Sequence, residues 1–267
     1  MSKINSTIYE IQTIDNMANK DQWVNHIHPL VKLFLTIFYI VNVVSFDKYN
    51  LMGLLGMVVY PLVMFEIAEA SFGEALRKLK FVLPLVCVVG VFNPFFDREI
   101  LIYIGTIPVS GGVLSMLTLM CKGIFTVLAS YLLIATTTIE KICYALRMLH
   151  VPKIFVTQVL LSYRYIRVLL LEAHRMTQAY ALRAPGQKGI RFGVWGTFVG
   201  QLLLRSMDRA ENIYESMCLR GYDGEFYYGR KQKWKVGDGV YLLIWTAMIA
   251  VFRFCPVFEM VGSLFWA

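Results

Sequence analysis

The sequence has little charge and few cysteines. Only 16% of its 267 residues are Asp, Glu, Lys or Arg and 57% are hydrophobic, whereas an average soluble domain has about 25% charged and about 45–50% apolar residues. These values exclude a disordered chain and most soluble enzymes. The five cysteines are scattered and form no CxxC pair, so neither a zinc site nor a disulfide framework is expected. The pair His26-x-His28 has no carboxylate or cysteine beside it, and we expect no metal site in this chain.

The motifs of common catalytic sites are also absent from the sequence. It contains no GxxxxGK[ST] phosphate loop, no HExxH zinc motif and no Asp-rich cluster for a lipid phosphate enzyme. We therefore expect a chain that is not catalytic alone and that binds neither ATP nor another cofactor. A self-sufficient secondary transporter is the less favoured alternative, because the chain has no inverted repeat with interrupted helices.

Long apolar runs dominate the sequence. A helix needs about 20 mostly apolar residues to cross about 30 Å of hydrocarbon. Five runs approach or reach this length, and they cover residues 29–46, 51–70, 81–96, 108–135 and 239–254. The sequence therefore predicts an all-α integral membrane protein with about five transmembrane helices. We therefore expect the chain to lie in the cell membrane and to contact the lipid bilayer.

The basic residues are concentrated in one segment before the last apolar run. Residues 136–237 hold 16 of the 26 Lys and Arg and 7 of the 18 Asp and Glu, a net charge of +9. Because cytoplasmic segments are rich in Lys and Arg, we predict that this module and the amino terminus are cytoplasmic and the carboxy terminus is outside. The predicted domains are residues 1–135, 136–237 and 238–267. The basic aromatic stretch 222–235 adjoins a span, which favours contact with lipid over nucleic acid.

Two long helices are predicted inside this basic module. Residues 153–182 form an apolar helix with one polar stripe, which either lies along the membrane or crosses it as a sixth span. Residues 196–220 form an amphipathic helix, with Arg205, Arg209 and Glu211 away from its apolar seam. The seam is expected to pack against another helix, and it consists of Leu203, Met207, Ala210, Tyr214 and Met217.

Both helices end on a leucine, an arginine and a small residue. The triplets are Leu182-Arg183-Ala184 and Leu219-Arg220-Gly221. Either arginine alone could simply complement the helix dipole. Two copies of the triplet in one basic module favour docking to partners over simple helix capping. Each guanidinium would reach an acidic or carbonyl-lined groove on one of two similar partner subunits.

Lys122 is a charge in the middle of the fourth apolar run. A charge at that depth costs at least about 2.5–3.5 kcal/mol and usually faces other helices. Lys122 therefore either organises the bundle, with Glu66 or Glu69 as its partner, or marks a shifted span boundary.

Three stretches carry a resemblance to a known family. They are residues 136–176, residues 204–224 with the pattern R-S-x-x-R-A-E…M-x-x-R-G-Y, and the opening segment DQWVNHIHPLVKLF. In these stretches the chain resembles the transmembrane (T) component of energy-coupling factor (ECF) transporters. The Tyr163-Arg164-Tyr165-Ile166 segment and the Tyr214-x-x-Met217 spacing resemble the CbiQ type, which serves cobalt or nickel uptake.

The resemblance implies a scaffold in an ATP-driven importer. Such a subunit joins two cytoplasmic ABC-type ATPases, which bind the ATP, to a separate substrate-binding membrane subunit, which supplies the substrate ligands. Leu219-Arg220-Gly221 matches the second ATPase-coupling motif, and Leu182-Arg183-Ala184 is the best match to the first, with its register open. Arg205, Arg209 and Glu211 would support the coupling helix. A T component of a vitamin importer is the alternative.

Overall fold

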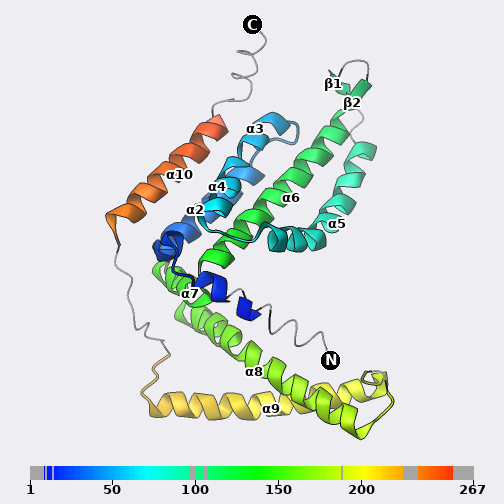
Figure 1. The fold of residues 1–267 in the computed structure, drawn as a ribbon, viewed down its shortest axis with the longest axis vertical. Helices are drawn as coiled ribbons and strands as arrows, with labels where there is room; N and C mark the ends of the chain where they lie inside the picture. The colour runs from blue at the N-terminus through cyan, green and yellow to red at the C-terminus, as the bar shows by residue number, and fades with distance from the viewer. Residues whose placement is uncertain are drawn as a thin grey trace. The chain divides into compact units, whose positions relative to one another are not determined.

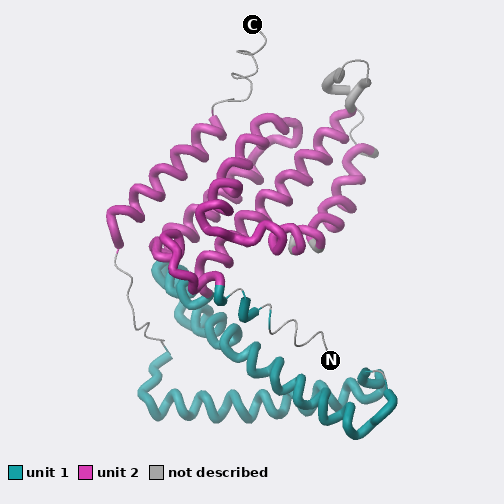
Figure 2. Tube along the Cα trace, viewed as in Figure 1, with its two compact units in different colours: residues 1–16, 139–231 teal, residues 17–138, 232–267 magenta. Residues whose placement is uncertain are grey.

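The computed structural model describes residues 9, 11–13, 15–96, 100–104, 107–187, 189–224 and 234–254. The chain forms two compact units, which Figure 2 distinguishes by colour. Unit 1 comprises residues 1–16 and 139–231, and unit 2 comprises residues 17–138 and 232–267.

Unit 2 is built around one long central helix, α6 (Gly111–Thr136). Around it α2, α3, α4 and α5 pack directly, and α10 packs on α2 and α3 (Figure 1). The surrounding elements are η1 (Trp23–His26), α2 (Pro29–Val44), α3 (Leu51–Gly56), α4 (Val59–Ile67), α5 (Phe72–Phe96), β1 (Ile100–Ile104), β2 (Ile107–Ser110) and α10 (Val236–Phe254). An all-α membrane fold is thereby confirmed, with a small β-hairpin between α5 and α6 as its one departure in the described ranges.

The apolar runs become helices whose limits differ from the predicted ones. The second run is divided between α3 and α4, and the third begins earlier, at Phe72, so that Pro84 and Pro94 lie inside α5. The fourth run was predicted from residue 108, but residues 107–110 pair with β1 and α6 begins at Gly111. Within the described residues, Gly111–Thr136, Lys153–Arg183 and Val236–Phe254 are long and apolar enough to cross a membrane, and 29–44, 51–67 and 82–94 are shorter apolar helices.

The core of unit 2 contains aliphatic side chains and a group of aromatic rings that contact one another across helices. The Tyr60 ring lies 4.6 Å from that of Tyr39 and 4.9 Å from that of Trp245, measured between centroids. These contacts join α2, α4 and α10. The Tyr39 hydroxyl donates to the Met57 carbonyl at 2.8 Å, so its polar atom is satisfied inside the apolar layer.

Buried side chains satisfy the ends of several helices in unit 2. Lys32 is 4% exposed and its Nζ donates to the carbonyl of Thr136, the last residue of α6, at 2.8 Å. Asp238 is also buried, and its two carboxylate oxygens accept from the backbone N–H groups of His28 and Lys235 at 3.0 and 2.9 Å. Asp238 therefore caps the start of α10 and holds it against the start of α2, where the His28 ring accepts from the Leu30 N–H.

Replacing Lys32 tests how much its hydrogen bond to the last residue of α6 stabilises the folded protein. We expect Lys32→Met to keep the packed stem but to leave the Thr136 carbonyl without its charged donor, which costs about 1.5–3 kcal/mol for a hydrogen bond to a charged group. Unfolding of the detergent-solubilised protein measures this loss. Lys20→Met, at an exposed site, is the control and should have little effect. Equal stability of the two variants would show that the Lys32 contact does not hold the helices.

Candidate functional site

Unit 1 consists mainly of three helices that follow the end of α6. They are α7 (Ile139–Met148), α8 (Lys153–Arg183) and α9 (Phe192–Leu219). Pro152 is the residue just before α8, a position where the missing proline N–H costs no hydrogen bond within the helix. α7 packs on α8 and α8 packs on α9. Figure 1 shows that α8 and α9 meet at an angle and do not run parallel along their whole length.

An ion pair joins α8 and α9 where they cross. A carboxylate oxygen of Glu172 is paired with Nη1 of Arg205, and the other lies 3.9 Å from Nη1 of Arg175. The Glu172 side chain is 16% exposed and that of Arg205 is 55% exposed, so one partner of the pair is sheltered and the other faces solvent. Arg205, which the sequence assigned to coupling-helix support, therefore contacts α8 directly. The sequence reasoning gave Glu172 no role, although it is the one acidic residue between 153 and 183.

Two open grooves flank this crossing. One has a volume of about 570 Å³ and is mostly polar on its α9 side, and the other, of about 290 Å³, is more apolar. Arg209 lines both grooves, whereas Glu211 lies exposed on α9. The predicted support residues are thus divided between the crossing, the grooves and the outer surface.

The predicted apolar seam of α9 is wrong in part. Leu203, Met207 and Tyr214 are more than half exposed, and α9 has no buried residue in the described part of the chain. Ala210, Tyr214 and Met217 of the seam line the smaller groove beside α8. The larger groove is lined by residues of a neighbouring face, among them Leu202, Ser206 and Ile213. A continuous seam requires two helices that stay together over several turns, and helices that cross at one point bury only a short patch.

The first Leu-Arg-small triplet lies at the exposed end of α8. The Leu182 side chain is 83% exposed and Arg183 is exposed beside it. The Ala184 N–H donates to the Tyr180 carbonyl at 3.0 Å and the Gln187 N–H to the Ala184 carbonyl at 3.4 Å. Gly186 supplies the left-handed residue of this turn, with φ of 91°. Backbone groups thus close the helix end without the arginine.

The second triplet has the same exposure at the end of α9. Leu219 is 89% exposed, and Gly221 is left-handed with φ of 80°, as its sequence position predicts. The N–H groups of Gly221 and Tyr222 donate to the carbonyls of Cys218 and Met217 at 2.9 and 3.0 Å, which is a Schellman closure. One turn earlier, a hydrogen bond with Cys218 raises the pKa of the Tyr214 phenol.

Neither motif arginine acts as a cap in the described residues. No hydrogen bond or ion pair joins the Arg183 or Arg220 guanidinium to another described group. Backbone N–H groups instead donate to the Tyr180 carbonyl at the first end and to the Met217 and Cys218 carbonyls at the second.

The crossing point also determines how far the two motifs are separated. Arg183 follows Glu172 by 11 residues and Arg220 follows Arg205 by 15. At 1.5 Å per residue these arms are about 16 and 22 Å long. A change in the crossing angle would therefore move the two arginines relative to each other.

Lys122 has different partners from those suggested by the sequence. Its Nζ donates to the carbonyls of Val44, at 3.0 Å, and Phe46, just past the end of α2. Glu69 instead accepts from the Gln22 amide at 3.0 Å. Arg253 of α10 donates to the Ser45 carbonyl at 3.1 Å and lies over the Phe46 ring. The end of α2 is thus held by cations from α6 and α10.

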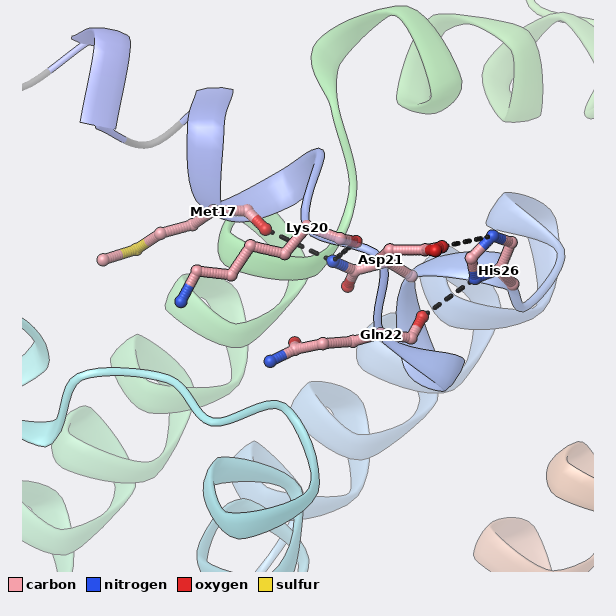
Figure 3. Close-up of polar contacts among 6 residues, drawn as sticks. Met17, Lys20, Asp21, Gln22 and His26 are labelled. Atoms are coloured by element: carbon pink, nitrogen blue, oxygen red, sulfur yellow. Dashed lines mark hydrogen bonds and ion pairs between the residues drawn. The ribbon is translucent and has the colours of Figure 1, made fainter.

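The two histidines near the amino terminus do not converge on one site. Figure 3 shows His26 between Asp21, whose carboxylate lies 3.2 Å from Nε2, and the Gln22 carbonyl, 3.0 Å from Nδ1. The His28 ring is engaged with the Leu30 N–H. Among the described residues no group of three His, Cys, Asp or Glu side chains could hold a metal ion.

Comparison with known proteins identifies the family. The sequence model of the cobalt transport protein family CbiQ matches residues 20–232. The chain belongs to the CbiQ family. An uncharacterized protein of Methanocaldococcus jannaschii is 31% identical over 123 residues, which are 44% of this chain and 42% of that relative. The chain thus spans less than half the length of this curated relative. With its long apolar helices, family membership makes the chain a membrane protein of a transport class.

The CbiQ match includes the crossing and both candidate motifs. Residues 182–184, 205–211 and 219–221 all lie within 20–232, whereas α10 begins after its end. The family signal therefore extends over the whole region in which the exposed arginines occur.

Removing the charge of Glu172 tests whether the crossing determines the motif separation. Spin labels at Leu182 and Leu219, in a variant without native cysteines, report the distance between the two ends. We expect Glu172→Gln to broaden this distance distribution, because the Arg205 pair that holds the crossing is lost. Glu215→Gln, at an exposed site on α9, is the matched control. A distribution for Glu172→Gln as narrow as that of the control would contradict the role of this ion pair.

Proposed function

We propose that this CbiQ-family chain is the transmembrane scaffold and coupling subunit of an ATP-driven ECF-type importer. It transmits the motion of two cytoplasmic ABC-type ATPase subunits to a separate substrate-binding membrane subunit. The proposal fits a chain that has apolar helices and no phosphate loop and that therefore depends on partners for ATP.

The pair of exposed Leu-Arg ends carries this proposal. Leu182 and Leu219 are 83% and 89% exposed, and an apolar side chain at a helix end gains by being covered. Each leucine stands beside an arginine whose guanidinium forms no hydrogen bond or ion pair with another described group. An apolar contact next to a guanidinium is typical of an interface anchor, because arginine is enriched among residues that dominate binding energy.

Two such ends suit two ATPase subunits. Each motif completes a helix of about 30 residues, and each can enter a groove on one ATPase. Arg205 and Arg209 then act as support residues, because they belong to the crossing and the grooves between the helices. Glu211, exposed on α9, is assigned to the same support on the resemblance alone.

The proposed substrate is the cobalt ion. The support is the family description together with the poor metal chemistry of this chain, in which no three-ligand group occurs among the described residues. The metal ligands would belong to the substrate-binding subunit, and this chain would carry force without contacting the ion.

The proposed orientation places residues 136–237 and the amino terminus in the cytoplasm and the carboxy terminus outside. The support is the net charge of +9 in residues 136–237. Labelling of intact cells with an impermeant thiol reagent tests it, using a cysteine introduced at Gln187. The orientation requires this cysteine to stay unlabelled, and labelling from outside would overturn it.

Conservative changes of the motif arginines test docking directly. Lysine keeps the charge but cannot form the planar two-bond contact of arginine, so we expect Arg220→Lys to weaken ATPase assembly and cobalt uptake. Arg183→Lys should do the same to a smaller extent. Truncation of a buried interface arginine costs about 2 kcal/mol or more, roughly thirtyfold in affinity. Co-purification of ATPase subunits and uptake of radiolabelled Co²⁺ are the two measurements.

Arg164→Lys, at an exposed position of α8 outside both motifs, is the control and should assemble normally. All variants should reach the membrane in equal amounts. If the double variant Arg183→Glu with Arg220→Glu still assembled and took up cobalt like the unchanged protein, docking through these arginines would be excluded.

A further inference from the structure

Asp15 fastens the amino-terminal segment to α8. The carboxylate oxygen Oδ1 accepts a hydrogen bond from the Tyr163 hydroxyl, and Oδ2 lies 3.6 Å from Nη1 of Arg167. Tyr163 and Arg167 are four residues apart, so they share one face of the helix. We call the contact among Asp15, Tyr163 and Arg167 the clasp. All three residues belong to unit 1.

The clasp is more sheltered than an ordinary surface ion pair. The Asp15 side chain is 20% exposed and that of Arg167 is 40% exposed. Asp15 also receives a neutral hydroxyl and a cation at the same time, so both of its oxygens are used. A hydrogen bond to a charged group changes an opening equilibrium by about tenfold or more.

Two residues further along the chain, a second anchor holds Met17 in unit 2. The Asn25 amide donates to the Met17 carbonyl at 3.2 Å and to the Lys20 carbonyl at 2.9 Å, and Figure 3 shows these carbonyls. Asn25 is buried. Only Asn16 separates the residue fastened in unit 1 from the residue fastened in unit 2.

This segment is therefore a short covalent connection between the units that is fastened on both sides. The chain passes between the units at two other places, from Thr138 to Ile139, where α7 begins, and at residues 231–232, which lie outside the described residues. The first of these leads to α8 only through α7. The clasp, in contrast, acts on α8 itself, between its start and the crossing at Glu172.

We propose that Asp15 is a positioning residue for coupling. Through its contacts, movement of α8 is transmitted to the segment that begins unit 2 at Met17. This inference rests on the proposed coupling function and adds a second route of transmission beside α7. Without the clasp, α8 would move while the amino-terminal segment stayed behind, and ATP hydrolysis would continue with less transport.

Hydrogen exchange tests the clasp itself, independently of transport. In the purified full-length chain we expect Asp15→Asn, Tyr163→Phe and Arg167→Gln each to speed amide exchange in residues 11–18, by about tenfold for Asp15→Asn. Arg164→Gln, at an exposed position of the same helix, is the matched control and should leave exchange unchanged. Equal exchange in Asp15→Asn and the control would overturn the clasp.

Coupling is tested with the assembled complex in proteoliposomes. We expect Asp15→Asn and Arg167→Gln to bind the ATPases and hydrolyse ATP like the unchanged protein, but to take up several-fold less Co²⁺ per ATP hydrolysed. The double variant should be no worse than the more severe single variant, because both changes break one contact. A Co²⁺ to ATP ratio equal to that of Arg164→Gln would overturn the coupling role.

The two assays separate this inference from the proposed function. If the unchanged chain assembled with no ATPase, the proposed function would fail and the coupling role of Asp15 with it, while hydrogen exchange would still decide whether the clasp exists. If the unchanged chain assembled with the ATPases and took up Co²⁺, and the Asp15 variants transported as much Co²⁺ per ATP as it does, the inference would fail and the proposed function would stand.

Discussion

The main constraint on unit 2 is that the backbone carbonyl groups at its helix ends need hydrogen-bond donors. The last carbonyl groups of a helix have no partner within that helix, so donors from elsewhere in the chain must satisfy them. Lys32 supplies one at the end of α6, and Lys122 and Arg253 supply others at the end of α2. At the starts of α2 and α10 the Asp238 carboxylate accepts hydrogen bonds from backbone N–H groups. In each case a charged side chain of one helix satisfies the backbone at the end of another, which also fixes the helices against each other.

The basic module follows a different principle. Its α9 has no buried residue in the described part of the chain, and it contacts α8 through the Glu172–Arg205 ion pair and along two grooves. At its two helix ends Leu182 and Leu219 are exposed, and the neighbouring arginine side chains form no hydrogen bond or ion pair with another described group.

Much of the fold follows from hydropathy and turn residues. The apolar runs became helices because length and composition suffice for that, and Gly221 indicated the end of α9 because few other residues tolerate its φ. The hairpin at 100–110 was missed, since an apolar run can form strand or helix and periodicity does not separate them. The α9 seam was misjudged because a heptad pattern does not report whether the partner helix runs parallel or crosses.

The partners of charged residues were the hardest to predict. Lys122 was expected to face a carboxylate, but it contacts backbone carbonyls, which a sequence does not mark. Glu172 was recognisable as a lone acid in a basic, apolar helix, yet its link to Arg205 depends on the crossing point of two helices. The motif arginines were located from repetition of a triplet, and the structure adds that the backbone closes both helix ends without them.

The central claim is that this chain couples partner ATPases to transport and has no ATPase activity of its own. Native mass spectrometry of the purified assembly, combined with nucleotide binding to the chain alone, tests it most directly. The account predicts one copy of this chain with two ATPase subunits and a membrane partner, and nucleotide bound only when the ATPases are present. Saturable ATP binding by the isolated chain, or a transport-competent assembly that lacks ATPase subunits, would contradict it.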